Sequence, residues 1–418
     1  MSLFDRFLSD MIRHGVLTVT MHDGEVRRFG TPAPGFPEIA IRLADARVAR
    51  DIALKPELAA GEAYMNHRLI VENDDIMGLL TLIRLNSPWE KGKVPDDHRR
   101  ISRVWGRLMG RLDRLNWDAR AKRNVAHHYD LDDRLYDLFL DENRQYSCGY
   151  FRDPETDLDT AQRDKMAHIA AKLDLRPGMR VLDIGSGWGG MALYLNRHFD
   201  VDVVGITLSE EQLGYARRAA ARAGVADRVT FELVDYRDVR GTFDRIVSVG
   251  MFEHVGPPHY RRFYAKCRDL LTDDGVMLLH TIGRMSTPGT TDQWASKYIF
   301  PGGYAPSLSE ITAASERSFI QTDAETWRLH YAWTLRHWYA RIMANRAAIE
   351  AIYDARFFRM WQFYFSGCAS AFEHGVLCVY QLQYTKDRRA LPVTRDYMVA
   401  VEARLRTEVA AERVTENA

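Results

Sequence analysis

Apolar positions in the first part of the chain follow several short patterns. The first fifteen residues place apolar side chains at helical spacing, and an Asp-Gly turn separates two short strand-like runs. The elements predicted here are a helix over residues 1–15, a hairpin of Val16–Thr20 and Val26–Phe29, and helices at Pro56–Leu69 and Asp75–Leu85. This mixture predicts a small α+β domain over residues 1–124.

Beyond residue 124, apolar runs alternate with amphipathic stretches. Strands are predicted at residues 179–185, Val201–Ile206, Val229–Val234, Arg245–Val249, Val276–His280 and Leu377–Tyr384. Helices are predicted at Met191–His198 and Glu210–Ala223, and an aromatic helical block runs from Tyr331 to Phe372. Strands alternating with helices of this length indicate a parallel, doubly wound sheet. Residues 125–418 are therefore predicted to form an α/β domain with helical insertions.

A basic stretch, Arg99–Arg123, precedes the predicted boundary. It contains nine arginines and lysines against Asp113 and Asp118, and its apolar residues form a stripe at helical spacing. A basic amphipathic helix is typical of proteins that lie on an anionic membrane. A linker helix packed on its neighbour, with solvated arginines, would show the same pattern. Both interpretations remain open.

Composition narrows the class of protein. The 418 residues carry 57 basic and 57 acidic side chains, a balance that argues against a dedicated nucleic-acid binder. Four cysteines without CxxC spacing predict reduced thiols, and we predict no metal site. No apolar run approaches the ~20 residues that cross a bilayer, and the N-terminus lacks a signal-peptide core. We expect a cytoplasmic protein, soluble or peripheral to the membrane.

A glycine loop supplies the first candidate chemistry. Val181–Gly190 reads as a strand, a glycine turn and the start of a helix, and Gly185 and Gly187 would let the backbone approach a ligand. The string also satisfies GxGxxG, so a dinucleotide is one candidate ligand.

The acidic residues near this loop favour a different cofactor. A dinucleotide site needs an acid at the end of the second strand, where this chain reads Gly205-Ile206-Thr207-Leu208. Acids stand instead at Asp183, before the glycines, and at Asp235, after the third strand, where a carboxylate could accept from an adenine amino group. This placement favours S-adenosylmethionine, with a dinucleotide or a purely structural turn as alternatives.

Several further blocks, taken together in order, carry a family resemblance. They are the glycine loop, GITLSEEQ (205–212), GMFEHVG (250–256), LHTIG (279–283) and KYIFPGG (297–303). The chain from about His127 to Tyr384 resembles the cyclopropane-fatty-acyl-phospholipid synthase family, whereas its first 120 residues are similar only in size and character. The resemblance implies a Rossmann-like class I methyltransferase fold. It also implies transfer of the methyl carbon of S-adenosylmethionine to a cis double bond of a phospholipid acyl chain, followed by ring closure.

The resemblance also implies a set of site residues. Cofactor contacts would come from Tyr146, Ser147, Gly185, Gly187, Thr207, Leu208, Gln212, Asp235 and Tyr236, and Asp183 joins them from its place before the glycines. A bound bicarbonate would be held by Cys148, Glu253, His280, Ile282 and Tyr331. Cys368 matches a family cysteine near the acyl chain. Two departures from the family pattern, at Asp132–Tyr136 and at Gly149, touch the lid over the cofactor.

The implied reaction requires a particular chemical environment, and the sequence can be searched for residues that would provide it. An alkene needs no base to act as a nucleophile, but the methylated carbocation needs π-faces, exclusion of water and a proton acceptor. Eight aromatic rings between Tyr353 and Phe372 could line an acyl cavity, or could simply be core.

Competing functions differ in the fate of that cation or in the cofactor. Loss of a different proton would leave a methyl-branched or methylene chain. Two further hypotheses are an NAD-type oxidoreductase and a catalytically silent binding protein. The expected partner is an unsaturated phospholipid in the inner face of an anionic membrane, with no nucleic acid. Two copies as a homodimer would strengthen that attachment by avidity.

Overall fold

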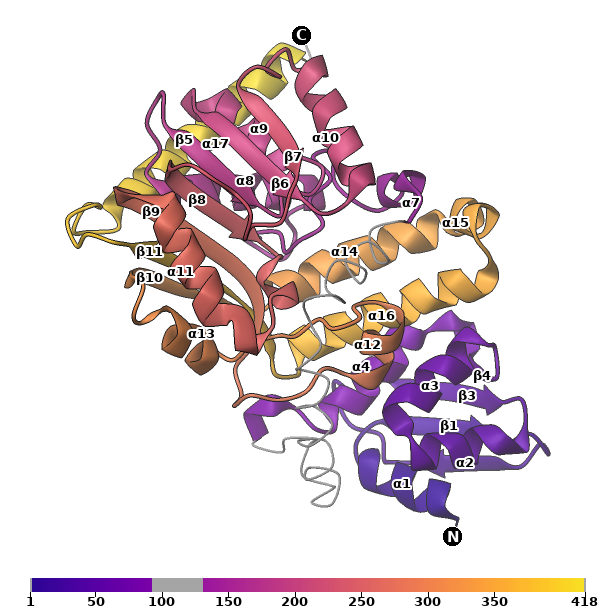
Figure 1. Cartoon of the computed structure of the whole chain (residues 1–418). Helices are drawn as coiled ribbons and strands as arrows, with labels where there is room; N and C mark the ends of the chain where they lie inside the picture. Colours follow the sequence, from indigo (N-terminus) through magenta and orange to yellow (C-terminus); the bar gives the residue numbers. More distant parts are fainter. Residues whose placement is uncertain (1, 92–130, 417–418) are drawn as a thin grey trace. The chain divides into compact units, whose positions relative to one another are not determined.

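The computed structural model describes residues 2–91 and 131–416. The basic stretch Arg99–Arg123 and the predicted boundary near residue 124 lie outside these residues. The described residues form two compact units (Figure 1). The first contains residues up to 91, Thr290–Pro301 and Leu335–Leu377, and the second contains residues 131–289, 302–334 and 378–416. The chain therefore passes from one unit to the other more than once.

The first unit is built on a four-stranded sheet of order β2-β1-β3-β4. Its elements are α1 (Leu3–Met11), β1 (Val16–Thr20), β2 (Val26–Phe29), β3 (Glu38–Leu43), α2 (Ala46–Leu54), α3 (Pro56–Met65), β4 (Leu69–Val71), η1 (Glu72–Asp74), α4 (Ile76–Leu85), η2 (Trp89–Lys91), α12 (Gln293–Tyr298), α15 (Arg346–Ile352) and α16 (Ala355–Glu373). The predicted hairpin is confirmed, with Leu17 opposite Phe29. The helix predicted over Pro56–Leu69 is too long, because His67 adopts φ +56° and Leu69 begins β4.

The aromatic block of the C-terminal part is divided among α14 (His330–Ala344), α15 and α16. Helix α16 packs against α3 and α4, and its Phe363 contacts Trp294 edge-on at 4.7 Å between ring centroids. Phe358, Trp361 and Phe365 are fully buried. Many of these rings therefore fill the interior of the first unit, and an acyl cavity among them stays a prediction.

The second unit contains a seven-stranded sheet of order β10-β11-β9-β8-β5-β6-β7. Its elements are α7 (Asp133–Asp137), α8 (Leu158–Leu173), β5 (Arg180–Ile184), α9 (Gly190–Phe199), β6 (Asp202–Thr207), α10 (Glu210–Arg222), β7 (Val229–Leu233), β8 (Phe243–Val249), η4 (Phe252–His254), η5 (Pro257–His259), α11 (Tyr260–Leu270), β9 (Leu271–Arg284), α13 (Leu308–Ser315), β10 (Ile320–Trp327), β11 (Leu377–Thr385) and α17 (Asp396–Glu416). Strands β5 to β9 are parallel, whereas β10 pairs antiparallel with β11. The predicted doubly wound α/β fold is confirmed.

Both faces of this sheet are covered, because successive strand residues belong to different cores. Val181 of β5 packs with residues of α8, α9, α10 and α17, whereas Leu182 packs with α11 and α13. Leu278 and Leu279 of β9 divide in the same way. A sheet buried on both faces leaves the carboxyl ends of its parallel strands as the place for a ligand.

Candidate active site

The glycine turn after β5 is shaped by left-handed backbone conformations. Gly185 and Gly187 have φ of +86° and +54°, a region that L side chains rarely adopt. The N–H groups of Gly185 and Ser186 both donate to the carbonyl of Ile206 at 2.9 Å, which ties the turn to β6. A Cβ on Gly185 would lie 2.8 Å from Cβ of Met251, whereas a Cβ on Gly187 would meet nothing within 4 Å. Open space therefore lies directly beside Gly187.

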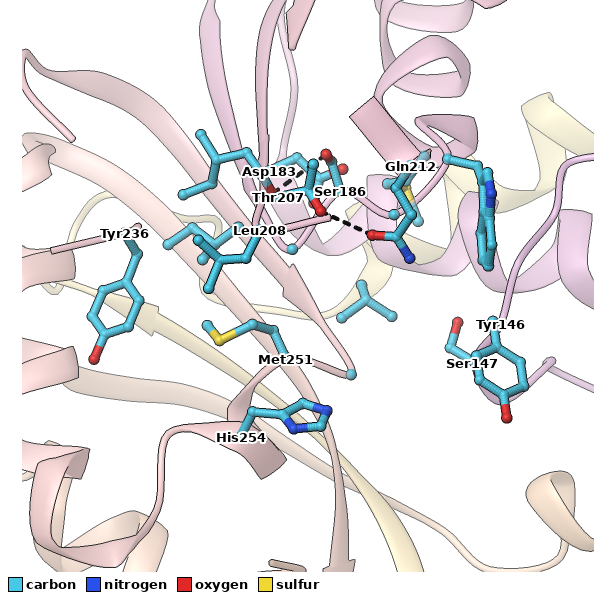
Figure 2. A pocket seen from close by; sticks show the side chains of 18 of the residues that line it. Tyr146, Ser147, Asp183, Ser186, Thr207, Leu208, Gln212, Tyr236, Met251 and His254 are labelled. Atoms are coloured by element: carbon cyan, nitrogen blue, oxygen red, sulfur yellow. Dashed lines mark hydrogen bonds between the residues drawn. The ribbon is translucent and has the colours of Figure 1, made fainter. Parts of the chain in front are cut away.

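One pocket lies at the carboxyl ends of β5, β6, β7 and β8. All ten residues predicted to contact the cofactor line it: Tyr146, Ser147, Asp183, Gly185, Gly187, Thr207, Leu208, Gln212, Asp235 and Tyr236. Figure 2 labels Tyr146, Ser147, Asp183, Thr207, Leu208, Gln212 and Tyr236 among them. In Figure 2, Tyr236, Leu208 and Met251 lie toward one end of the pocket, and Tyr146 and Ser147 toward the other. The structure thus brings together residues that are spread over ninety positions of the sequence.

The pocket also has lining residues that the sequence analysis did not identify. They are Arg144, Gln145, Ile184, Ser186, Trp188, Met191, Ile206, Val234, Arg237, Val249, Gly250, Met251, His254, Val255 and His259. Gly250 and Met251 directly follow β8, so the rule that ligands bind at strand ends would have found them. His254 is partly buried, and desolvation lowers its pKa to about 4, so the imidazole is neutral at pH 7.

Two lining residues of the β6–α10 region are held by a short polar network. Thr207 donates from its hydroxyl to Oε1 of Gln212 at 2.8 Å, and Ser209 caps α10 by accepting from the N–H of Gln212. Because Gln212 is buried and held at both its backbone and its side chain, its amide is fixed at the pocket wall.

Asp235 has a partner of its own within the pocket wall. Its carboxylate accepts from Nε and Nη2 of Arg237 at 2.8 and 2.7 Å. The guanidinium of Arg237 therefore orients the carboxylate of Asp235. Because a carboxylate has about four lone pairs, Asp235 can still accept a hydrogen bond from an adenine amino group, as predicted.

A buried lysine supports the opposite wall. Lys165 of α8 is fully buried and donates to Oε1 of Gln145 at 2.7 Å and to Oγ of Ser147 at 2.8 Å. Burial lowers the pKa of Lys165 to about 8 and raises the pKa of nearby Asp183 to about 7. Oδ2 of Asp183 is buried and has no hydrogen-bond partner within the described residues. This unsatisfied carboxyl at the glycine turn suits a cationic ligand.

The residues predicted to hold bicarbonate form two groups just outside the pocket lining. In the first, Oε1 of Glu253 accepts from the N–H of Ile282 at 2.6 Å, and His280 stands two residues earlier on the same strand. Burial raises the pKa of Glu253 to about 7, and its Oε2 is buried without a partner among the described residues. A half-protonated carboxyl with a free oxygen can donate a hydrogen bond to an anion.

The second group joins Cys148 to the start of α14. The N–H of Gly149 donates to Oγ1 of Thr334 at 2.9 Å, so Cys148 lies beside the helical turn that carries Tyr331. Both Cys148 and Tyr331 are buried, and burial raises the pKa of the Cys148 thiol. This thiol is therefore protonated at neutral pH and unsuited to nucleophilic attack.

The comparisons with known proteins agree with this geometry. Residues 117–382 match the model of the family described as mycolic acid cyclopropane synthetase. The chain is 38% identical over 359 residues to the cyclopropane-fatty-acyl-phospholipid synthase of Escherichia coli (strain K12), covering 86% of this chain and 91% of that protein. It is 33% identical over 398 residues to the tuberculostearic acid methyltransferase UfaA1 of Mycobacterium tuberculosis, covering 91% and 90%.

A solved relative also carries a ligand. The structure is similar to that of mycolic acid cyclopropane synthase CmaA1 in complex with SAH (S-adenosylhomocysteine) and CTAB. The two are 34% identical, with a TM-score of 0.60 over 63% of this chain and 97% of the other.

Proposed function

The chain belongs to the mycolic acid cyclopropane synthetase family of S-adenosylmethionine-dependent methyltransferases, and from this premise we propose that it acts as a cyclopropane-fatty-acyl-phospholipid synthase. It transfers the methyl carbon of S-adenosylmethionine to the cis double bond of an unsaturated phospholipid acyl chain. The methyl group then loses a proton and closes a three-membered ring, leaving S-adenosylhomocysteine. The observation that carries the proposal is the pocket at the ends of β5 to β8, which gathers all ten predicted cofactor residues.

The buried carboxyl of Glu253 is evidence in favour of a bicarbonate site beside the cofactor. Its free Oε2 and its raised pKa fit a carboxyl that donates to an anion, with neutral His280, the Cys148 thiol and the Tyr331 hydroxyl as further ligands. When bound, bicarbonate supplies a proton acceptor close to a carbocation. The protein's own part is to hold that anion away from water, because Glu253, His280 and Cys148 are all buried.

The activity is tested with vesicles that contain a cis-monounsaturated phospholipid. On incubation with S-adenosylmethionine, the acyl chains should gain the mass of one CH2 group and become resistant to hydrogenation. NMR of the product should show upfield ring protons. Vinyl or branched-methyl signals instead would establish the alternative methylene or methyl-branched product, and an unchanged lipid would contradict both.

The role of Glu253 is tested by Glu253→Gln. We expect turnover to fall by about 10²-fold or more, because the variant cannot change its protonation state beside the anion. Affinity for S-adenosylhomocysteine should stay close to that of the wild type. A comparable loss of both quantities would instead place Glu253 in the cofactor site.

We also propose peripheral attachment to the inner face of an anionic membrane through the basic stretch Arg99–Arg123. None of the helices in the described part of the chain is long and apolar enough to cross a membrane. Replacing Arg103, Arg107 and Arg111 with glutamine should weaken binding to anionic vesicles by at most about 1 kcal/mol per charge. Binding to neutral vesicles serves as the control, and unchanged binding to anionic vesicles would contradict the proposal.

A further inference from the structure

His280 is held on two sides by residues that the family comparison does not assign. Its Nδ1 lies 3.0 Å from Nε2 of Gln381 on β11, and its ring meets Trp327 edge-on at 5.1 Å between centroids. His280 and Gln381 are both fully buried or nearly so, at 2% and 0% exposed. The ring therefore has little freedom to rotate.

Burial also fixes the charge of this ring. It lowers the pKa of His280 well below the usual value, and the cations Lys165, Lys172 and His168 lower it further, against a smaller opposing effect of Glu325. The imidazole is therefore neutral at pH 7. A neutral imidazole has one N–H, and the partner of one nitrogen decides which nitrogen carries it.

The amide of Gln381 meets Nδ1 with its NH2 group, which only donates. Nδ1 must then accept, so the proton of His280 resides on Nε2. Within the described part of the chain, the orientation observed leaves the carbonyl oxygen and one N–H of the amide without a partner, whereas the reverse orientation would leave both N–H groups without an acceptor. Orphaned N–H groups are the rarer case in proteins, so the observed orientation is favoured. Oε1 of Gln381 is buried without a partner among the described residues, an uncommon arrangement for a polar core residue.

We infer that Gln381 is a positioning residue that holds His280 as the Nε2–H tautomer, so that the ring presents a hydrogen-bond donor on the side away from Gln381. This inference rests on the proposed function in one respect, namely that the donor serves the anion held with Glu253. The Nε2–H of His280 and the protonated form of Glu253 would give an anion two uncharged donors.

The chain offers a matched control on the same strand. Gln383 stands two residues beyond Gln381 on β11 and is also buried, but its Nε2 donates to the hydroxyl of Tyr397 at 2.8 Å and to the carbonyl of Lys172. A change at Gln383 therefore perturbs the same strand without touching His280.

The tautomer itself can be measured without substrate. In the full chain labelled with 15N-histidine, long-range 1H–15N spectra distinguish Nε2–H from Nδ1–H rings, and His280→Asn identifies the signal of His280. The wild type should show the Nε2–H pattern. An Nδ1–H pattern would overturn the inference, and this measurement needs no variant of Gln381 to fold.

Gln381→Glu then tests the cause. A carboxylate at this place accepts rather than donates, so His280 should move its proton to Nδ1 or become doubly protonated. The Gln383→Met control should keep the wild-type pattern. An unchanged His280 signal in Gln381→Glu would overturn the assignment of Gln381.

A kinetic measurement links the tautomer to the proposed anion. Gln381→Glu should raise the bicarbonate concentration needed for half-maximal turnover by about tenfold or more, with affinity for S-adenosylhomocysteine within about twofold of the wild type. If turnover of the wild type does not depend on bicarbonate concentration, the anion part of the proposed function is overturned. The tautomer of His280 is then still determined by the spectra. An equal loss of cofactor affinity in Gln381→Glu would overturn the positioning role.

Discussion

Gly185 and Gly187 stand in one turn and serve different purposes. Both have positive φ, but Gly185 abuts Met251, whereas Gly187 faces open space in the pocket. The first is therefore required by packing and the second by the approach of a ligand. The sequence identified both as glycines of a ligand loop, but only the folded chain separates the two reasons.

Gly187→Ala should weaken binding of S-adenosylhomocysteine by about tenfold, or ~1.4 kcal/mol, since the new methyl group enters the pocket. It should also lower the free energy of unfolding by about 1–2 kcal/mol, the cost of a left-handed conformation. Gly241→Ala is the matched control, with φ +95°, open space around it and a place outside the pocket lining. Calorimetry and urea unfolding check both values, and equal ligand affinity in the two variants would contradict the role of Gly187.

Glu253 makes stability depend on pH. Its pKa is raised from 4.5 to about 7 in the folded chain, so the native state binds more protons than the unfolded state between these values. The free energy of unfolding should therefore fall as pH rises from about 4.5 to 7, by up to about 3 kcal/mol from this group. In Glu253→Gln that contribution is absent, so the variant should lose less stability over this range. Urea unfolding at pH 5 and pH 7 measures the difference, with exposed Glu155→Gln as the variant expected to behave like the wild type.

At the scale of elements, the central parallel strands of the second unit could be predicted from the sequence, whereas the edge strand β10 and helix α8 could not. Strands β5, β6 and β8 are apolar runs buried on both faces, which is the pattern that periodicity detects. Strand β10 reads IQTDAETW and is largely exposed, so it lacks that signal. Helix α8 is not detected from the sequence because Gln162, Lys165 and Lys172 are buried in it. The helix therefore lacks the separation of apolar and polar faces by which an amphipathic helix is predicted.

The candidate site divides in the same way. Residues at or just past strand ends, such as Thr207 and Asp235, could be placed from the sequence because the carboxyl ends of parallel strands share one edge of the sheet. Lys165 and Gln381 do not stand at that edge; they hold Ser147 and His280 through hydrogen bonds between segments that are distant in the sequence. No local pattern in the sequence indicates such contacts, so only the folded chain shows them.

The two buried lysines of α8 should respond differently to removal. Lys165 donates hydrogen bonds only to the neutral groups Gln145 and Ser147. Lys165→Met removes a buried charge that is costly to desolvate but leaves two buried acceptors without a donor, so the free energy of unfolding at pH 7 should change by less than about 1 kcal/mol. Its cost should appear as weaker binding of S-adenosylhomocysteine, because Gln145 and Ser147 lose their common donor. Lys172 pairs with Glu325 at 2.5 Å, and Lys172→Met should cost about 3 kcal/mol by leaving that carboxylate without this cation. Urea unfolding and calorimetry separate the two; a Lys165→Met variant as unstable as Lys172→Met would contradict the distinction.

At the scale of the whole molecule, the pocket couples ligand binding to the stability of the second unit. Every residue that lines the pocket belongs to this unit, and its core is completed by α17, whose Leu405 is fully buried. A ligand that binds only the folded form must therefore stabilise this unit against unfolding.

S-adenosylhomocysteine at one hundred times its dissociation constant should raise the free energy of unfolding by about 2.7 kcal/mol. NADH at the same concentration should have no effect, because β6 ends at Thr207 without an acid to hold a dinucleotide ribose. Thermal unfolding followed by circular dichroism measures both. Stabilisation by NADH alone would revive the oxidoreductase hypothesis.

The interleaved path of the chain has a consequence for its synthesis. Helices α3 and α4 emerge early from a ribosome, whereas α16, which packs against both, follows only after the whole of β5 to β10. An N-terminal fragment that stops before β9 would leave the apolar sides of α3 and α4 uncovered and prone to aggregation. The first unit thus completes its interior late in translation, and gene fragments meant to yield it must carry Thr290–Pro301 and Leu335–Leu377 as well.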